Sequence, residues 1–189
     1  MPVGAVLPRK RAVWVMGALI LAAQCGAALA DTIPITLRSI WGGPAKAVAV
    51  SGSTLYVGVG GTLRIFSIAT PSAPVLLGEA SVPGDIQGIA VVGSVAYLAA
   101  GSAGLQVVGV SDPSSPAKLG QLSTAGPAAD VTVVDGTAFL AVGMAGLQCV
   151  NVTVPISPQL LSTIAIGGRA TPGGVLNNII YFSADQDGP

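Results

Sequence analysis

The sequence predicts an all-β fold, a partial β-propeller built from four-stranded blades of about 42 residues. Two observations lead to this prediction. The chain repeats itself at a fixed interval, and each repeat consists of short apolar runs separated by turn-forming residues. We expect three to four blades, of which the last is incomplete.

The repeat is visible at several independent positions of the chain. Leucines, two series of prolines and a series of aromatic residues recur at this interval, the first aromatic step being shorter by one: Leu63, Leu105 and Leu147; Pro71, Pro113 and Pro155; Pro74, Pro116 and Pro158; Tyr56, Tyr97, Phe139 and Tyr181. A period of this length is typical of repeat proteins, in which each unit buries its apolar faces against its neighbours.

Each repeat is predicted to contain four strands. In the second copy these are Gly88–Val92, Val95–Ala100, Leu105–Val110 and a more polar Leu119–Ser123. Strands of about 5–6 residues joined by short turns account for a unit of about 40 residues. After residue 30, no stretch shows the 3.6-residue apolar period of a helix.

Pairs of adjacent apolar residues predict that most strands are buried on both faces. Neighbouring side chains of a strand point to opposite faces, so such pairs need cover on both sides; they are Val107–Val108, Val91–Val92 and Val133–Val134. The fourth strand carries Glu79 or Gln121 and is expected to face water. Blades stacked around an axis satisfy both expectations, whereas the rungs of the rival β-solenoid are usually shorter.

Residues 1–30 have the character of a signal peptide. The basic triplet at residues 9–11 precedes an apolar run, Ala12–Ala23, and residues 28–30 read Ala-Leu-Ala. We expect cleavage after Ala30 and a secreted protein, extracellular or periplasmic, with no membrane span after cleavage. The alternatives are an uncleaved anchor and a lipoprotein site at Cys25, which the preceding glutamine disfavours.

Charge excludes one class of partner. Without residues 1–30, the chain has five basic and eight acidic residues, a net charge of −3. No basic patch is visible, so we expect no nucleic-acid partner.

No candidate catalytic, cofactor-binding or metal-binding residues emerge from the sequence. The absence of histidine excludes Ser-His-Asp triads and histidine metal sites. Cys149 takes the place of Val107 and is interpreted as a small buried core residue. Asp130 and Asp135 resemble a carboxylate pair, but a capped turn is the preferred interpretation. Residues 185–188 resemble part of a calcium loop and are interpreted as a turn.

Three other features have both a functional and a structural interpretation. The aromatic series forms either a sugar-binding surface or, as we prefer, packing between blades. The segment Pro113–Pro116 fits a polyproline ligand, but its fixed place in the repeat favours a rigid connection between strands. Asn151–Thr153 fits an N-glycosylation acceptor, which has no role in a bacterial protein.

Residues 95–116, VAYLAAGSAGLQVVGVSDPSSP, resemble the LVIVD repeat of bacterial extracellular proteins. The matching features are Tyr97 in the second strand, Gly104–Leu105 at the start of the third and Val110–Pro113 at its end. Departures occur where the pattern has its first aspartate, which is replaced by Ser67, Gly109 and Asn151. The resemblance implies β-propeller blades over most of residues 35–181, within a repeat domain at 31–189, and carries no catalytic residues with it.

The repeats at the two ends are incomplete. The fourth copy runs from about Ala170 to Tyr181, and Ile35–Ile40 has the place of a fourth strand without a blade of its own. We expect a fragment of a longer protein or a chain that pairs with another, with self-association through an exposed strand edge.

These observations predict a binding or scaffold module of the cell envelope or exterior, not an enzyme. Its partner would be a protein or a carbohydrate, because repeat proteins offer broad surfaces and variable loops. The alternative is a truncated part of an extracellular propeller enzyme, a hydrolase or lyase, whose catalytic residues lie outside the chain.

Overall fold

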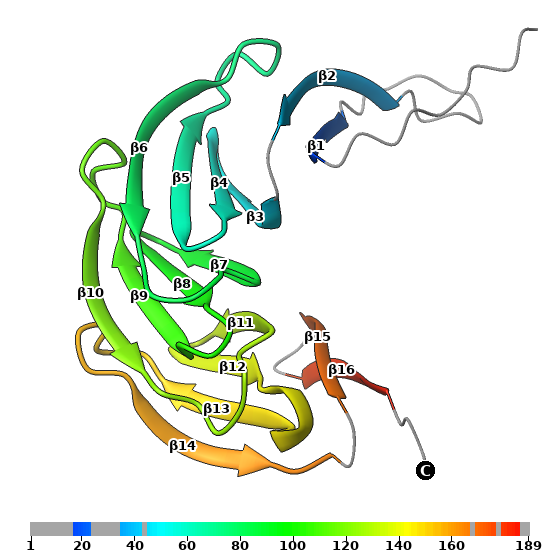
Figure 1. Ribbon diagram of the computed structural model, residues 1–189, viewed down its shortest axis with the longest axis vertical. Helices are drawn as coiled ribbons and strands as arrows, with labels where there is room; N and C mark the ends of the chain where they lie inside the picture. Colours follow the sequence, from blue (N-terminus) through cyan, green and yellow to red (C-terminus); the bar gives the residue numbers. More distant parts are fainter. Residues whose placement is uncertain (1–16, 24–34, 43–44, 167–168, 177–178, 186–189) are drawn as a thin grey trace, which may run out of the picture.

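The computed structural model of the chain describes residues 17–23, 35–42, 45–166, 169–176 and 179–185 (Figure 1). The expected cleavage site after Ala30, Cys25 and residues 186–188 of the calcium-like segment lie outside the described residues.

The described residues form an all-β structure dominated by three four-stranded antiparallel sheets. In each sheet the strands lie side by side in chain order, and we call the sheets blades 1, 2 and 3. Blade 1 contains β3 (Ala45–Ser51), β4 (Thr54–Val59), β5 (Thr62–Ser67) and β6 (Val75–Ser81). Blade 2 contains β7 (Gly88–Val92), β8 (Val95–Ala99), β9 (Leu105–Gly109) and β10 (Ala117–Leu122). Blade 3 contains β11 (Asp130–Val134), β12 (Thr137–Ala141), β13 (Leu147–Asn151) and β14 (Gln159–Ile164).

Two further sheets of two strands each lie at the ends of the row of blades. The first pairs β1 (Gly17–Ala23) with β2 (Ile35–Gly42), and the second pairs β15 (Arg169–Leu176) with β16 (Ile179–Asp185). The five sheets follow an open arc, with the outer strands β6, β10 and β14 on its convex side (Figure 1). A single 3-10 turn, η1 (Gly143–Ala145), interrupts the connection between β12 and β13.

The all-β prediction is confirmed, and the strands of blade 2 follow the predicted ranges closely. β7 has the predicted bounds, while β8 and β9 each end one residue earlier than expected. β10 begins two residues earlier, at Ala117, because Ala117 and Lys118 pair with Gly109 and Val108 of β9. The strand therefore starts directly after the turn proline at 116.

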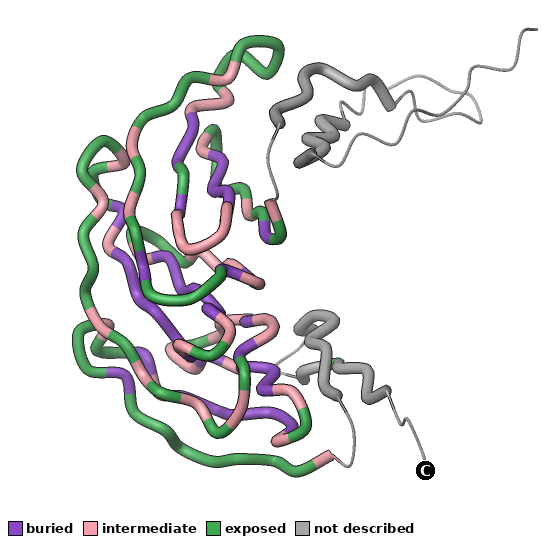
Figure 2. The backbone as a smooth tube through the Cα atoms, in the orientation of Figure 1, coloured by how far each residue is buried: buried purple, intermediate pink, exposed green. Residues whose placement is uncertain are grey.

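Most of the core lies between the blades, and a smaller buried cluster of Leu55, Val57 and Phe66 lies within blade 1. One buried cluster joins blades 2 and 3 and includes Tyr97 and Val107 from one side and Leu140 and Val150 from the other. A second cluster joins blades 1 and 2. Figure 2 shows the same division, with the buried residues concentrated in the central strands and the outer strands mostly exposed.

The prediction that third strands are buried on both faces is confirmed. Val107 and Val108 are both fully buried, Val107 in the cluster shared with blade 3 and Val108 in the cluster shared with blade 1. Each β9 side chain therefore packs into one of the two interfaces of its blade, as the alternation of a pleated strand requires.

The same prediction is wrong for the first strands. Val92 is 50% exposed, and Val91, Val133 and Val134 are only partly buried. These strands form the inner edge of the arc, where each has a neighbour strand on one side only. Val91 and Val133 pack against the clusters between blades, whereas the other valine of each pair is not part of a described cluster.

The connection between the third and fourth strands is a tight turn in every blade. The backbone N–H groups of Ala73, Ser115 and Ser157 donate to the carbonyl oxygens of Thr70, Asp112 and Val154, at 2.9, 3.1 and 3.0 Å. The prolines of this segment thus form a rigid connection between strands, as predicted from their fixed place in the repeat.

The turns of blades 2 and 3 pack closely against the outer strand of the preceding blade. A Cβ added at Gly78 of β6 would lie 2.5 Å from the carbonyl oxygen of Pro113, and one at Gly120 of β10 would lie 2.5 Å from that of Pro155. The turn of a blade therefore presses on the outer strand of the preceding blade, and only glycine leaves room for it.

Two equivalent glutamines of the third strands differ in how well their hydrogen bonds are satisfied. In blade 3, Gln148 accepts from the N–H of Ala125 at 3.2 Å and donates to Oγ1 of Thr163 at 3.1 Å. In blade 2, Gln106 donates to the carbonyl of Ala103 at 2.8 Å, but its buried Oε1 has no partner in the described part of the chain. The position of Ala125 is taken there by Pro83, which has no N–H to donate.

We predict that Gly120→Ala lowers the free energy of unfolding by about 1–3 kcal/mol, because the new Cβ forces the Pro155 turn away from β10. Urea denaturation measures the change. Gly109→Ala is the matched control, since its Cβ would meet only the side chain of Leu119, at 3.3 Å. Equal losses of unfolding free energy in the two variants would contradict the close packing of the Pro155 turn against β10.

We predict that Gln148→Leu costs about 1 kcal/mol more than Gln106→Leu. The first variant removes two hydrogen bonds, whereas the second removes one together with a buried unpaired oxygen. The two residues occupy the same place in adjacent blades, so each variant serves as the control for the other in thermal or urea unfolding. A larger loss for Gln106→Leu would rule out this explanation.

Candidate functional site

The aspartate of the Ser-Asp-Pro segment in blade 2 is part of its own turn. Oδ1 of Asp112 accepts hydrogen bonds from the backbone N–H of Ser114 at 2.9 Å and from its hydroxyl at 2.6 Å. These hydrogen bonds, the side-chain one foremost, hold the pKa of Asp112 below its ordinary value. The carboxylate therefore stabilises its own turn, with Oδ1 occupied by both hydrogen bonds from Ser114.

Two of the residues at the departures from the LVIVD pattern, Asn151 and Ser67, form turns of the same kind three residues earlier in the repeat. Oδ1 of Asn151 accepts from the backbone N–H of Thr153 at 3.0 Å and from its hydroxyl at 2.7 Å. Oγ of Ser67 accepts from the N–H of Ala69 at 3.5 Å. Asparagine and serine can replace aspartate here because each offers a short side-chain oxygen to the N–H two residues ahead.

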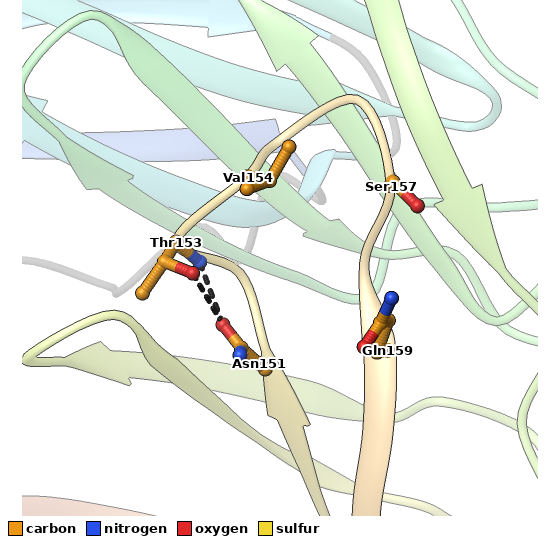
Figure 3. A pocket seen from close by; sticks show the side chains of 5 residues that line it. All are labelled: Asn151, Thr153, Val154, Ser157 and Gln159. Atoms are coloured by element: carbon orange, nitrogen blue, oxygen red, sulfur yellow. Dashed lines mark hydrogen bonds between the residues drawn. The ribbon is translucent and has the colours of Figure 1, made fainter.

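A pocket of about 240 Å³ lies beside this turn of blade 3 (Figure 3). It is lined by Asn151, Thr153, Val154, Ser157 and Gln159, so four of its five residues are polar and none is charged. Figure 3 shows Asn151 and Gln159 on the two strands that flank the loop, at the end of β13 and the start of β14. Amide and hydroxyl groups therefore line part of the opening, and the rest of its surface is apolar.

The two amides of the pocket are particular to blade 3. At the same repeat positions, blade 2 has Gly109 in place of Asn151 and Ala117 in place of Gln159. Sequence reasoning missed this site, because it searched for catalytic and metal-binding residue types. The signal that would have found it is the replacement of two small residues by two amides one period later.

The two candidate carboxylates of blade 3 are kept apart. Asp130 begins β11 and Asp135 follows its end, so a strand of five residues separates them by about 16 Å. Oδ1 of Asp130 accepts from the N–H of Val131 at 2.8 Å, and burial raises the pKa of this carboxyl. Asp135 adopts φ 45° in the turn before β12.

Two members of the aromatic series, Tyr56 and Tyr97, and Cys149 belong to the core, whereas Phe139 is only partly buried. Tyr56 and Tyr97 are buried in the two interfaces between blades, and this burial raises the pKa of both phenols. Packing between blades is thus confirmed for these two, whereas Tyr181 is 54% exposed. Cys149 is buried and free, as predicted.

The described residues contain no group of three or more His, Cys, Asp or Glu side chains placed to hold a metal ion. Lys46 and Asp85 form an ion pair of 3.2 Å between blade 1 and the loop before β7, with both side chains about half exposed, so it adds little stability. Within the described ranges, the structure has no helix with the length and apolarity that a membrane crossing requires.

Solved structures of low sequence identity share this fold. The computationally designed Ika4 protein has a TM-score of 0.63 and 14% identity, over 75% of this chain and 86% of its own. The designed Ika8 protein has a TM-score of 0.62 and 14% identity, over 75% and 43%. A functionally unknown protein from Desulfotomaculum acetoxidans DSM 771 has a TM-score of 0.66 and 15% identity, over 82% and 54%. The chain thus spans about half the length of the last two.

No curated protein matches the chain. The family comparison, in contrast, agrees with the resemblance found in the sequence. The LVIVD repeat matches residues 42–81, which contain all of blade 1, and residues 83–124, which contain all of blade 2. Blades 1 and 2 therefore each match one LVIVD repeat.

Proposed function

We propose that this protein is an exported binding and scaffold module whose blades form part of a β-propeller, and that it binds its ligand without transforming it. The polar residues of the repeat motif support this, because Asp112 and Asn151 use their oxygens within their own turns. The positions at which the repeats differ are therefore the positions available to recognise a ligand.

The ligand site is the blade 3 pocket, and the ligand is a carbohydrate. The observation that carries this assignment is the set of uncharged polar side chains, Asn151, Thr153, Ser157 and Gln159, that line the pocket beside apolar surface. Amides and hydroxyls both donate and accept, which suits the hydroxyl groups of a sugar. The Asn151 side-chain N–H₂ stays available as a donor, since the turn uses only the oxygen.

Export is the second part of the proposal and rests on the basic and apolar segment at residues 1–30. We predict that bacterial cells expressing the full chain place it outside the cytoplasm, and that deletion of residues 1–30 retains it inside. Cell fractionation followed by immunoblotting measures both. A full chain found only in the cytoplasmic fraction contradicts export.

We predict that the chain co-sediments with at least one of three insoluble polysaccharides, peptidoglycan, cellulose or chitin. Gln159→Ala and Asn151→Gly together should weaken retention about tenfold or more, as expected for the loss of two hydrogen bonds of about 1 kcal/mol each. Both changes introduce residues that blade 2 already carries at these positions, so the fold tolerates them.

Ser115→Ala in blade 2 is the control for this experiment, because Ser115 is the equivalent of the pocket residue Ser157. It should leave retention unchanged. The proposed site is wrong if the double variant binds as well as the unchanged chain, and the proposed ligand class is wrong if none of the three polysaccharides retains the protein.

A further inference from the structure

The turn of blade 3 exposes aliphatic side chains beside the pocket. Val154 is 53% exposed and Ile156 is 67% exposed, and Leu160, the second residue of β14, is 49% exposed. We call these three residues the aliphatic rim. Val154 lines the pocket, and Ile156 and Leu160 each stand next in sequence to a residue that lines it. The proposed sugar site is therefore bordered by apolar groups that meet water.

The other blades carry polar residues in this part of the turn. One period before the rim, the residues of blade 2 are Asp112, Ser114 and Lys118. Two periods before it, those of blade 1 are Thr70, Ser72 and Leu76. All three turns nevertheless close with the same backbone hydrogen bond. The turn itself therefore does not require valine and isoleucine, which only blade 3 has at these two places among the three blades.

The exposure of the rim belongs to its place in the repeat. Blade 2 has a complete blade after it, and its Asp112 and Ser114 are exposed nevertheless. Blade 1 also has a complete blade after it, and Leu76 is 46% exposed, close to the value for Leu160. A following blade does not cover these positions, so the rim is accessible whatever adjoins blade 3.

The segment that carries the rim has no charge. Residues 136–168, which include β12, β13, the turn and β14, contain no Asp, Glu, Lys or Arg, and the chain has no histidine. Transfer of a charged side chain from water into a lipid layer is unfavourable, whereas transfer of Val, Ile or Leu is favourable. The outer end of blade 3 therefore enters an apolar phase without desolvating an ion.

The rim lies on both faces of the outer strand. Gln159 lies opposite Asn151 in the pairing of β14 with β13, and Leu160 lies opposite Val150. Neighbouring residues of a strand point to opposite faces, so Leu160 lies on the face away from Gln159. Figure 3 shows Val154 on the loop that projects beyond the two strands. A lipid layer surrounds an inserted loop on all sides, whereas a protein partner covers one face of it.

The composition of the rim also favours a lipid over a protein. Protein interfaces are enriched in aromatic residues, Met and Arg, and their energetic hot spots are poor in Leu and Val. Neither the rim nor the pocket contains an aromatic residue, Met or Arg. Aliphatic side chains beside uncharged amides and hydroxyls match the two parts of a glycolipid, its acyl chains and its sugar.

We propose that blade 3 binds a lipid whose headgroup is an uncharged sugar, at the surface of a membrane. The aliphatic rim enters the outer part of the lipid layer, and the polar side chains of the pocket hold the sugar. This inference rests on the proposed sugar binding and names the carrier of the sugar. It requires no anionic lipid, because residues 136–168 contain no basic side chain. Added salt should therefore not weaken binding.

The test is flotation of the full chain with phosphatidylcholine vesicles that contain digalactosyldiacylglycerol. Ile156→Ser together with Leu160→Lys should lower the affinity for these vesicles about tenfold or more, because two aliphatic side chains no longer leave water. Both changes introduce residues that blade 2 already carries at these positions, and neither residue lines the pocket. We call this double variant the rim variant.

Leu76→Lys is the matched control, because it makes the same change at the same place in blade 1, beside a turn without valine or isoleucine. It should leave vesicle binding unchanged. The apolar run Ala12–Ala23 is present in every variant, so the differences between variants report on the rim. In vesicles of phosphatidylcholine alone, the difference between the unchanged chain and the rim variant should shrink, because the pocket then has no sugar to hold.

Three results would overturn the inference. They are a rim variant that floats as well as the unchanged chain, an equal difference in vesicles without the glycolipid, and self-association through the rim without any flotation, which would assign the rim to a second copy. The rim variant should still be retained by the polysaccharide that retains the unchanged chain. Failure of the inference therefore leaves the proposed function standing, whereas the proposed function fails when no polysaccharide retains the unchanged chain.

Discussion

The packing of one blade against the next is the interaction on which the rest of the structure depends. The third strand of blade 2 is buried on both faces, with Val107 facing blade 3 and Val108 facing blade 1. A single four-stranded sheet with two apolar faces has no interior of its own and gains stability only from its neighbours. With only 8% charged residues and ion pairs that are mostly exposed, burial between blades has to provide most of the stability.

The same constraint explains where the recurring residues lie. The proline turns of blades 2 and 3 each rest on a glycine of the preceding outer strand. Asp112 accepts hydrogen bonds within its turn, and Asn151 accepts them just before the turn of blade 3. Residues that recur with the period therefore maintain the blade. Recognition is left to positions at which the repeats differ, and Asn151 and Gln159 of blade 3 are such positions.

The sequence by itself determined the period, the strands of each repeat, the turns between them and the double-sided burial of Val107 and Val108. All of these follow from local patterns: strand alternation, turn-forming residues and a fixed spacing. Only the tertiary structure decided that Val92 lies exposed on an inner edge, that Gln106 Oε1 has no hydrogen-bond partner among the described residues, and that Asn151 and Gln159 border one pocket. These features depend on how sheets curve and on which edges are covered, and the contacts involved join residues of different strands and different blades.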